Sequence, residues 1–202
     1  MAQSITTIDE AVSSFMTLNV QSVGLSDKQF EILCRDNPDK RIELTAEREL
    51  IIMPPTGFIT GSRNAELIYA LVAWSKKDGT GLCFDSSTLF TLPNGAKRSP
   101  DASWISLERC NALTDEEKEG FAPICPDFVL ELRSPSDTLS VLQDKMTEYI
   151  ENGAQLGWLI DPKNRCIHIY RPNQAAEILM NAESISGDPV LKGFVLNLTE
   201  IW

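Results

Sequence analysis

Two carboxylates occupy positions where an ionised side chain is costly unless it binds something. Asp101 follows Ser99-Pro100 at the start of a strand-like segment, and Glu131 lies inside the most apolar segment of the chain, Phe128–Leu132. A carboxylate in apolar surroundings ionises only when a cation, a hydrogen bond or a metal compensates its charge. Two such carboxylates, with a carbonyl and water, would form the oxygen-rich site that Mg²⁺ or Mn²⁺ prefers.

Each carboxylate also has a purely structural interpretation. Asp101 could cap a turn after the proline, and Glu131 could pair with Arg133, two residues on along the same strand face. The helix expected after Glu131 carries a further candidate, Lys145, at the edge of an apolar stripe and one turn before Tyr149. Such a lysine either extends to water or projects its ammonium into a site formed by the preceding strand.

Composition and charge argue against several other classes of function. The 202 residues include 18 Lys and Arg against 29 Asp and Glu, a net charge of −11. Bulk positive charge therefore cannot attach the chain to DNA or to an anionic membrane. The five cysteines form no CxxC pair and the only histidine is His168, which argues against a zinc site of the Cys/His type and a Ser-His-Asp triad. His168 alternates with two isoleucines and is expected to face solvent or a hydrogen-bond partner.

The N-terminus lacks the charged and apolar regions of a signal peptide. No apolar run approaches the roughly 20 residues that a membrane span requires. We therefore expect a cytoplasmic protein with no membrane partner.

The elements that must position the candidate residues follow one another along the whole chain. Ser26–Gln29 is typical of a capping box at the start of a short helix, and Arg41–Leu44 with Glu49–Met53 predicts a hairpin. Longer helices are expected over 62–77 and 138–152. Further strands are expected at 82–84, 89–92, 102–105, 128–132, 156–160, 166–170, 178–180 and 194–198. This order favours an α/β or α+β fold in which helices flank a central mixed sheet, with an N-terminal helix and hairpin and extra C-terminal strands.

One domain, 26–202, is expected after a weakly structured lead-in at 1–25. The apolar segments 178–180 and 194–198 would leave an edge or patch exposed, and two-fold pairing is the commonest way to cover one. The chain is therefore predicted to form a homodimer.

Several blocks of the sequence together resemble a known family. They are Arg98–Ser103, Pro126–Asp137, Lys145 with Tyr149 and Gly153, Trp158–Pro162, and the earlier Arg41–Leu44 and Asp85–Thr88. In this order they closely resemble the Uma-type putative restriction endonucleases, long catalogued as a domain of unknown function within the PD-(D/E)xK nuclease superfamily. The resemblance runs from about residue 25 to residue 202.

The resemblance implies a restriction-endonuclease-like core and Mg²⁺- or Mn²⁺-dependent hydrolysis of phosphodiester bonds, with DNA as the substrate. Asp101 and Glu131 would be catalytic residues that bind the metal, and Glu43 would be a further acidic residue of the catalytic site. The alternative is a catalytically silent relative that keeps the fold as a binding or assembly module.

The basic residue of the superfamily pattern is displaced in this chain. Arg133 stands where a lysine is expected two residues after the second acid, and the resemblance implies that Lys145 replaces that lysine. Arginine is too basic to exchange a proton near neutral pH, so Arg133 would bind substrate by orienting a phosphate or stabilising charge. Lys97 and Arg98 beside Asp101, together with Arg133 and Lys145, would form a local positive rim for DNA, although Lys97 and Arg98 also suit an ordinary turn.

Overall fold

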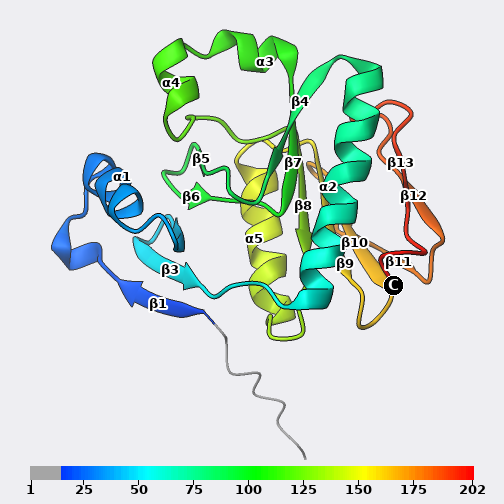
Figure 1. Ribbon diagram of the computed structural model, residues 1–202, viewed down its shortest axis with the longest axis horizontal. Coiled ribbons are helices and arrows are strands. Elements are labelled where there is room, and N and C mark those ends of the chain that lie inside the picture. Colours follow the sequence, from blue (N-terminus) through cyan, green and yellow to red (C-terminus); the bar gives the residue numbers. More distant parts are fainter. Residues whose placement is uncertain (1–14) are drawn as a thin grey trace, which may run out of the picture.

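The larger of two main β-sheets forms the centre of the molecule (Figure 1). The computed structural model describes residues 15–202, and within them this sheet has six strands in the order β11-β10-β9-β8-β7-β4. Its strands are β4 (Gly81–Asp85), β7 (Ala102–Ser106), β8 (Phe128–Leu132), β9 (Leu156–Asp161), β10 (Cys166–Tyr170) and β11 (Glu177–Met180). The β8–β9 pair is parallel and the other neighbours are antiparallel, so the predicted mixed central sheet is confirmed.

The smaller sheet contains the predicted hairpin. Its strand order is β1-β3-β2-β6-β5, and Glu43 of β2 lies opposite Ile51 of β3. Its strands are β1 (Met16–Asn19), β2 (Arg41–Leu44), β3 (Glu49–Met53), β5 (Phe90–Thr91) and β6 (Lys97–Arg98). Two C-terminal strands, β12 (Ser184–Ser186) and β13 (Val195–Asn197), pair only with each other among the described residues.

Some of the helices in the described residues begin after a residue whose side chain caps them, and others begin without a side-chain cap. The helices are η1 (Gln21–Val23), α1 (Asp27–Asp36), α2 (Phe58–Asp78), α3 (Leu107–Ala112), α4 (Asp115–Glu119) and α5 (Leu139–Glu151). The predicted capping box of α1 is present, because the Ser26 hydroxyl accepts from the Gln29 N–H and the Gln29 side chain accepts from the Ser26 N–H. The second helix begins at Phe58, earlier than predicted, because no residue after Pro55 excludes helical backbone.

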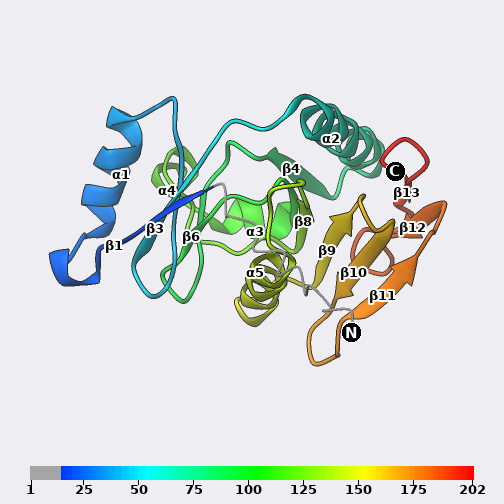
Figure 2. The same cartoon turned by 90° about the horizontal axis from the view of Figure 1, so that it is seen from below.

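The two long helices cover opposite faces of the six-stranded sheet (Figure 2). Leu67 and Leu71 of α2 belong to the core on one face, whereas Met146 and Tyr149 of α5 belong to the core on the other. Side chains alternate along β8, so Leu130 joins the α2 side and Val129 the α5 side. Glu131, two residues after Val129, therefore projects beneath α5.

Two expectations are corrected by the fold. Residues 1–14 lie outside the described part of the chain, but Met16–Asn19, within the expected lead-in, forms a strand paired antiparallel with β3. That strand is exposed along its length, and its pairing is a long-range contact that its own composition does not signal. His168 is buried because elements cover both faces of β10, so the solvent-facing alternative is wrong. The hydrogen-bonded alternative is confirmed, since its Nε2 lies 3.7 Å from the Cys166 sulfur.

Candidate active site

A cleft of about 950 Å³ holds the predicted catalytic residues. Its walls are formed by β2, β3, the start of α2, the end of β8 and one side of α5. Five of the six predicted site residues line it, namely Glu43, Arg98, Asp101, Glu131 and Lys145. The sixth, Arg133, lies outside its lining.

The ammonium group of Lys145 joins two of the carboxylates. Its Nζ lies 2.8 Å from Glu131 Oε1 and 3.0 Å from Glu43 Oε1. The helical repeat explains this placement, because Met146 and Tyr149 are buried against the sheet and Lys145 lies at the edge of that face. Burial lowers the pKa of Lys145, but Glu131 and Glu43 raise it by more, so the net pKa is raised. The predicted proximity is confirmed, and the alternative in which Lys145 extends to water is wrong.

Glu131 is buried beneath α5 and has two donors on one oxygen. Besides Lys145, the Tyr149 hydroxyl donates to its Oε1 at 3.1 Å. Burial raises the pKa of Glu131 and Lys145 lowers it, while Asp101 and Glu43 raise it again, to about 7 from an ordinary value of 4.5. Glu131 is therefore a carboxyl group whose charge depends on a nearby cation at neutral pH.

Arg133 does not pair with Glu131, so that structural interpretation is wrong. Its NH1 lies 2.6 Å from Asp161 Oδ2, and its Nε donates to the backbone carbonyl of Asp137. The parallel register places Leu132 opposite Ile160. Arg133 and Asp161 are the next residues, so they lie side by side at the ends of these two strands.

Asp101 reaches the end of β8 from the residue before β7. Its Oδ2 accepts the backbone N–H of Leu132 at 2.9 Å, and its Oδ1 lies 3.8 Å from NH2 of Arg41. The first contact joins two neighbouring strands, so the interpretation of Asp101 as a local turn cap is wrong. Burial raises the pKa of Asp101 although the Leu132 N–H and the charges of Lys145 and Arg41 lower it. Asp101 and Glu131 are thus two buried carboxylates, and Asp101 disfavours ionisation of Glu131.

Glu43 and Arg98 form an internal ion pair rather than an exposed rim. Glu43 accepts from the Ser99 N–H on Oε1 and from Arg98 NH1 on Oε2, and Arg98 Nε lies 2.5 Å from Glu148 Oε2. Burial raises the pKa of Glu43, but Lys145 and Arg98 lower it by more, so it is ionised at neutral pH. The Arg98 side chain is only 9% exposed.

Lys97 is also withdrawn from solvent. Its ammonium lies 3.2 Å from Asp27 and donates to the Thr91 hydroxyl, and the side chain is 3% exposed. The expected positive rim of Lys97 and Arg98 is therefore wrong, because both strand β6 side chains are used for internal contacts.

The pair Asp101 and Glu131 fits a divalent cation by its chemistry. Both are oxygen ligands, and burial is the main cause of the raised pKa of each, a cost of ionisation that a bound cation would offset. Within residues 15–202, no three His, Cys, Asp or Glu side chains converge as a ligand group. Such a pair leaves coordination positions for water, a carbonyl and a phosphate oxygen, as is usual for Mg²⁺.

Sequence reasoning assigned no role to three side chains that complete the site. Tyr149 fixes Glu131, Glu148 fixes Arg98, and Arg41 approaches Asp101. Spacing carries a signal for each of them. Glu148 and Tyr149 lie three and four residues after Lys145 on one helix, and Arg41 shares a strand face with Glu43.

No helix in the described part of the chain is both long enough and apolar enough to cross a membrane.

Comparison with known proteins agrees with the fold and extends over most of the chain. The chain is similar to the crystal structure of a putative nuclease belonging to DUF820 from Anabaena variabilis, with a TM-score of 0.69 at 19% sequence identity. The match covers 81% of this chain and 90% of that chain. No curated protein matches the sequence. The model of the family Uma2, described as putative restriction endonuclease, matches residues 27–199, and the chain therefore belongs to this family.

Proposed function

We propose that the protein is a metal-dependent nuclease that hydrolyses phosphodiester bonds in DNA. The observation that carries this proposal is the contact of the Lys145 ammonium with Glu131 and Glu43 in one cleft with Asp101. Family membership supports a nuclease. Carboxylates that can hold a divalent metal, with an ammonium beside them, suit metal-assisted phosphodiester hydrolysis.

Asp101 and Glu131 would hold the metal. Glu131 Oε1 already accepts from Lys145 and Tyr149, which leaves Oε2 as its ligand oxygen. Mg²⁺ or Mn²⁺, when bound, would polarise a phosphate oxygen and lower the pKa of the attacking water.

Lys145 would supply the cation that stabilises the reacting phosphate. An ammonium has three N–H donors, and two are directed at Glu131 and Glu43. The third remains for the attacking water or for an oxygen of the pentacoordinate phosphorus, where a fixed donor contributes most. Glu43 acts through Lys145 as a positioning residue, since Ser99 and Arg98 hold it from the other side.

A silent relative is the alternative function. That hypothesis is favoured if the carboxyls of Asp101 and Glu131 and the Lys145 ammonium diverge, or if Arg133 fills the metal position by pairing with Glu131. Lys145 contacts Glu131, and Arg133 contacts Asp161 instead of Glu131. The contacts support the enzyme.

A cleavage assay tests the proposal. Supercoiled plasmid, linear duplex and single-stranded DNA are each incubated with the protein and Mg²⁺ or Mn²⁺, beside Glu131→Ala and the matched control Glu151→Ala, whose side chain is exposed at the end of α5. We expect the wild type and the control to cleave at least one substrate, EDTA to stop cleavage, and Glu131→Ala to be inactive. Cleavage by Glu131→Ala at the wild-type rate, or no cleavage by the wild type, would contradict the proposal.

A further inference from the structure

The cleft is poor in cations that could bind a phosphate. Within the described residues it is lined by three basic side chains against eight acidic ones. The acidic residues are Glu43, Glu47, Glu49, Asp101, Glu131, Asp137, Asp144 and Glu148, and the basic ones are Arg41, Arg98 and Lys145. A polyanionic substrate would therefore rely on very few favourable charge contacts in this cleft.

Two of the three cations are engaged by close carboxylates. Arg98 contacts Glu148 at 2.5 Å and Glu43 at 3.2 Å. Lys145 contacts Glu131 and Glu43, both within 3.0 Å. These two side chains form ion pairs between the elements that line the cleft. Arg98 in particular is too buried to contact a nucleic-acid strand.

Arg41 differs from both. Within residues 15–202 its one ion pair is the long 3.8 Å contact between NH2 and Asp101 Oδ1. Its Nε is buried without a hydrogen-bond partner, and its side chain is 32% exposed. It lies two residues before Glu43 on β2, so both side chains project from the same face of the strand. A guanidinium has five N–H donors in a planar fork that matches a phosphate, and among the residues that the structure describes, the one charged partner of the Arg41 fork is the distant Asp101.

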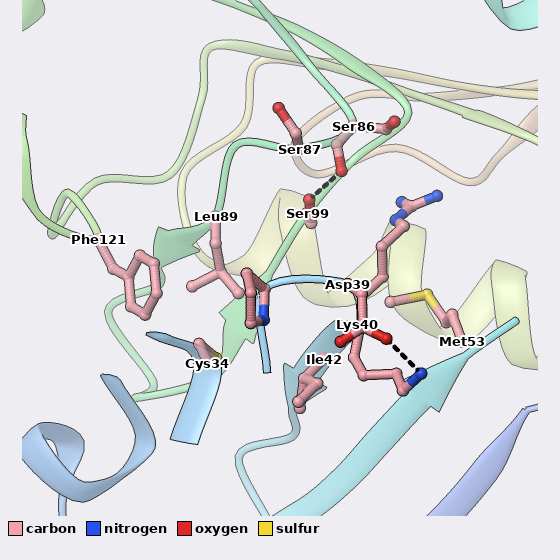
Figure 3. Close-up of a pocket in the computed structure, with 12 residues that line it drawn as sticks. Cys34, Asp39, Lys40, Ile42, Met53, Ser86, Ser87, Leu89, Ser99 and Phe121 are labelled. Atoms are coloured by element: carbon pink, nitrogen blue, oxygen red, sulfur yellow. Dashed lines mark hydrogen bonds and ion pairs between the residues drawn. The ribbon is translucent and has the colours of Figure 1, made fainter. Parts of the chain in front are cut away.

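Arg41 also borders a second, smaller cavity of about 220 Å³. Figure 3 shows this cavity, where Ser99 is hydrogen-bonded to Ser86 and the Lys40 ammonium is paired with Asp39. Because Lys40 is engaged by its neighbour at 2.7 Å, Arg41 is the cation with free donors that is common to the two cavities.

We propose that Arg41 binds a non-bridging oxygen of a substrate phosphate beside Asp101. The inference rests on the proposed nuclease function for its substrate, but it is tested by binding rather than by cleavage. It assigns substrate binding to Arg41 in place of the two arginines expected from the sequence, whose guanidinium groups pair with Glu43, Glu148 and Asp161.

The test is the salt dependence of DNA binding. Fluorescence anisotropy of labelled single-stranded and duplex oligonucleotides is measured with Ca²⁺, which takes oxygen ligands as Mg²⁺ does, between 50 and 200 mM KCl. The variants are Arg41→Gln, which removes the charge, and Arg41→Lys, which keeps the charge but not the fork. Arg171→Gln is the matched control, because it removes a charge from a surface pair with Glu177 outside the cleft.

We expect Arg41→Gln to weaken binding about tenfold and to reduce the slope of log affinity against log salt by about one, as loss of one phosphate contact does. Arg41→Lys should bind more weakly while keeping the wild-type slope, and Arg171→Gln should match the wild type. Equal affinity and slope for Arg41→Gln and the wild type would overturn the inference, as would absence of DNA binding by the wild type. Thermal unfolding of each variant verifies that it is folded.

The outcomes separate this inference from the proposed function. Binding that depends on Arg41, without cleavage in Mg²⁺ or Mn²⁺, would contradict the nuclease and leave Arg41 as a phosphate ligand. Cleavage that depends on Glu131, with binding that is insensitive to Arg41, would support the nuclease and overturn the role of Arg41.

Discussion

Lys145 Nζ lies 2.8 Å from Glu131 Oε1, so a helix supplies the cation to a carboxylate on the preceding strand. In this chain the residue two positions after that glutamate is Arg133, and its guanidinium is held 2.6 Å from Asp161 instead. The two basic residues thus have different tasks. Lys145 lines the cleft, whereas Arg133 forms an ion pair that links the ends of β8 and β9.

Lys145 should be required for cleavage, and its loss should also reduce stability. We expect Lys145→Ala to lower kcat by about 10²–10³-fold, as loss of a fixed donor to a reacting oxyanion does. It also removes the ammonium that Glu131 and Glu43 share, at a cost of about 3 kcal/mol in the free energy of unfolding. Lys145→Arg should restore part of the stability but not full activity, because a planar guanidinium does not replace a compact ammonium.

Steady-state kinetics and urea unfolding measure both effects, with Lys163→Ala in the exposed turn after β9 as control. Full activity in folded Lys145→Ala would exclude its catalytic role.

The stability of the metal-free protein should fall as pH rises through neutrality because of Glu131. Its pKa is about 7 in the folded protein against an ordinary 4.5, so the native state binds the proton more tightly than the unfolded state. This contribution to stability is fully present below about pH 4.5 and is lost as pH rises through about 7, with a slope of at most about 1.4 kcal/mol per pH unit.

The free energy of unfolding in EDTA at pH 5, 6, 7 and 8 tests this, compared with Glu131→Gln, which cannot titrate. The free energy of unfolding of the wild type should fall relative to that of Glu131→Gln as pH rises. A constant difference across this range would show that Glu131 has an unshifted pKa.

Divalent metal should stabilise the protein through Asp101 and Glu131. A ligand that binds the native state alone at 100 times its dissociation constant adds about 2.7 kcal/mol. Millimolar Mn²⁺ should therefore raise the Tm of the wild type but not of Asp101→Asn. An equal rise in Asp101→Asn, or none in the wild type, would argue against this site.

Arg133 should matter for stability rather than for chemistry. Its removal would leave Asp161, a fully buried carboxylate, with only the Asn164 amide groups as partners. We expect Arg133→Met to cost about 3 kcal/mol in the free energy of unfolding while kcat of the folded fraction stays near that of the wild type. A folded, stable and inactive Arg133→Met would instead assign Arg133 to the reaction.

Self-association through the apolar segments 178–180 and 194–198 stays a prediction from the sequence, but Phe194, Leu196 and Leu198 are buried, so the edge strand β11 is the segment that can carry it. Ile178 and Met180 are more than half exposed on this strand, an apolar edge of the kind that pairing covers. Light scattering at micromolar concentration should give twice the 22.5 kDa chain mass, and Ile178→Lys should give the monomer. Leu82→Lys, on the opposite edge strand β4, is the control; a monomeric wild type would contradict the prediction.

Local patterns predicted many of the helices and strands, and the helical repeat predicted where Lys145 lies on its helix. The apolar run of β8, the capping box of α1 and the hairpin of β2 and β3 are all present, because each depends on neighbours in sequence. Lys145 was placed at the edge of the buried face of α5 from the helical repeat alone, and its contact with Glu131 follows from that face packing on β8.

Partner choice among charged residues was not predictable in the same way. Arg133 and Glu131 are close in sequence, but the partner of Arg133 comes from β9 through the parallel register. Arg98 and Lys97 are charged residues that the sequence alone would place at the surface. Long-range ion pairs with Glu148 and Asp27 instead withdraw them from solvent. Such pairings depend on which strands become neighbours, and a local pattern does not contain that information.

The most direct measurement is the rate of DNA cleavage by the wild type and by Glu131→Gln under identical Mg²⁺ and salt, with both proteins shown to be folded. Glu131→Gln keeps the shape of the side chain but loses the charge that a metal and Lys145 require. The account predicts EDTA-sensitive cleavage by the wild type and a rate at least about 10²-fold lower for Glu131→Gln. Equal rates for the two proteins, or no cleavage by the folded wild type on any DNA, would contradict it.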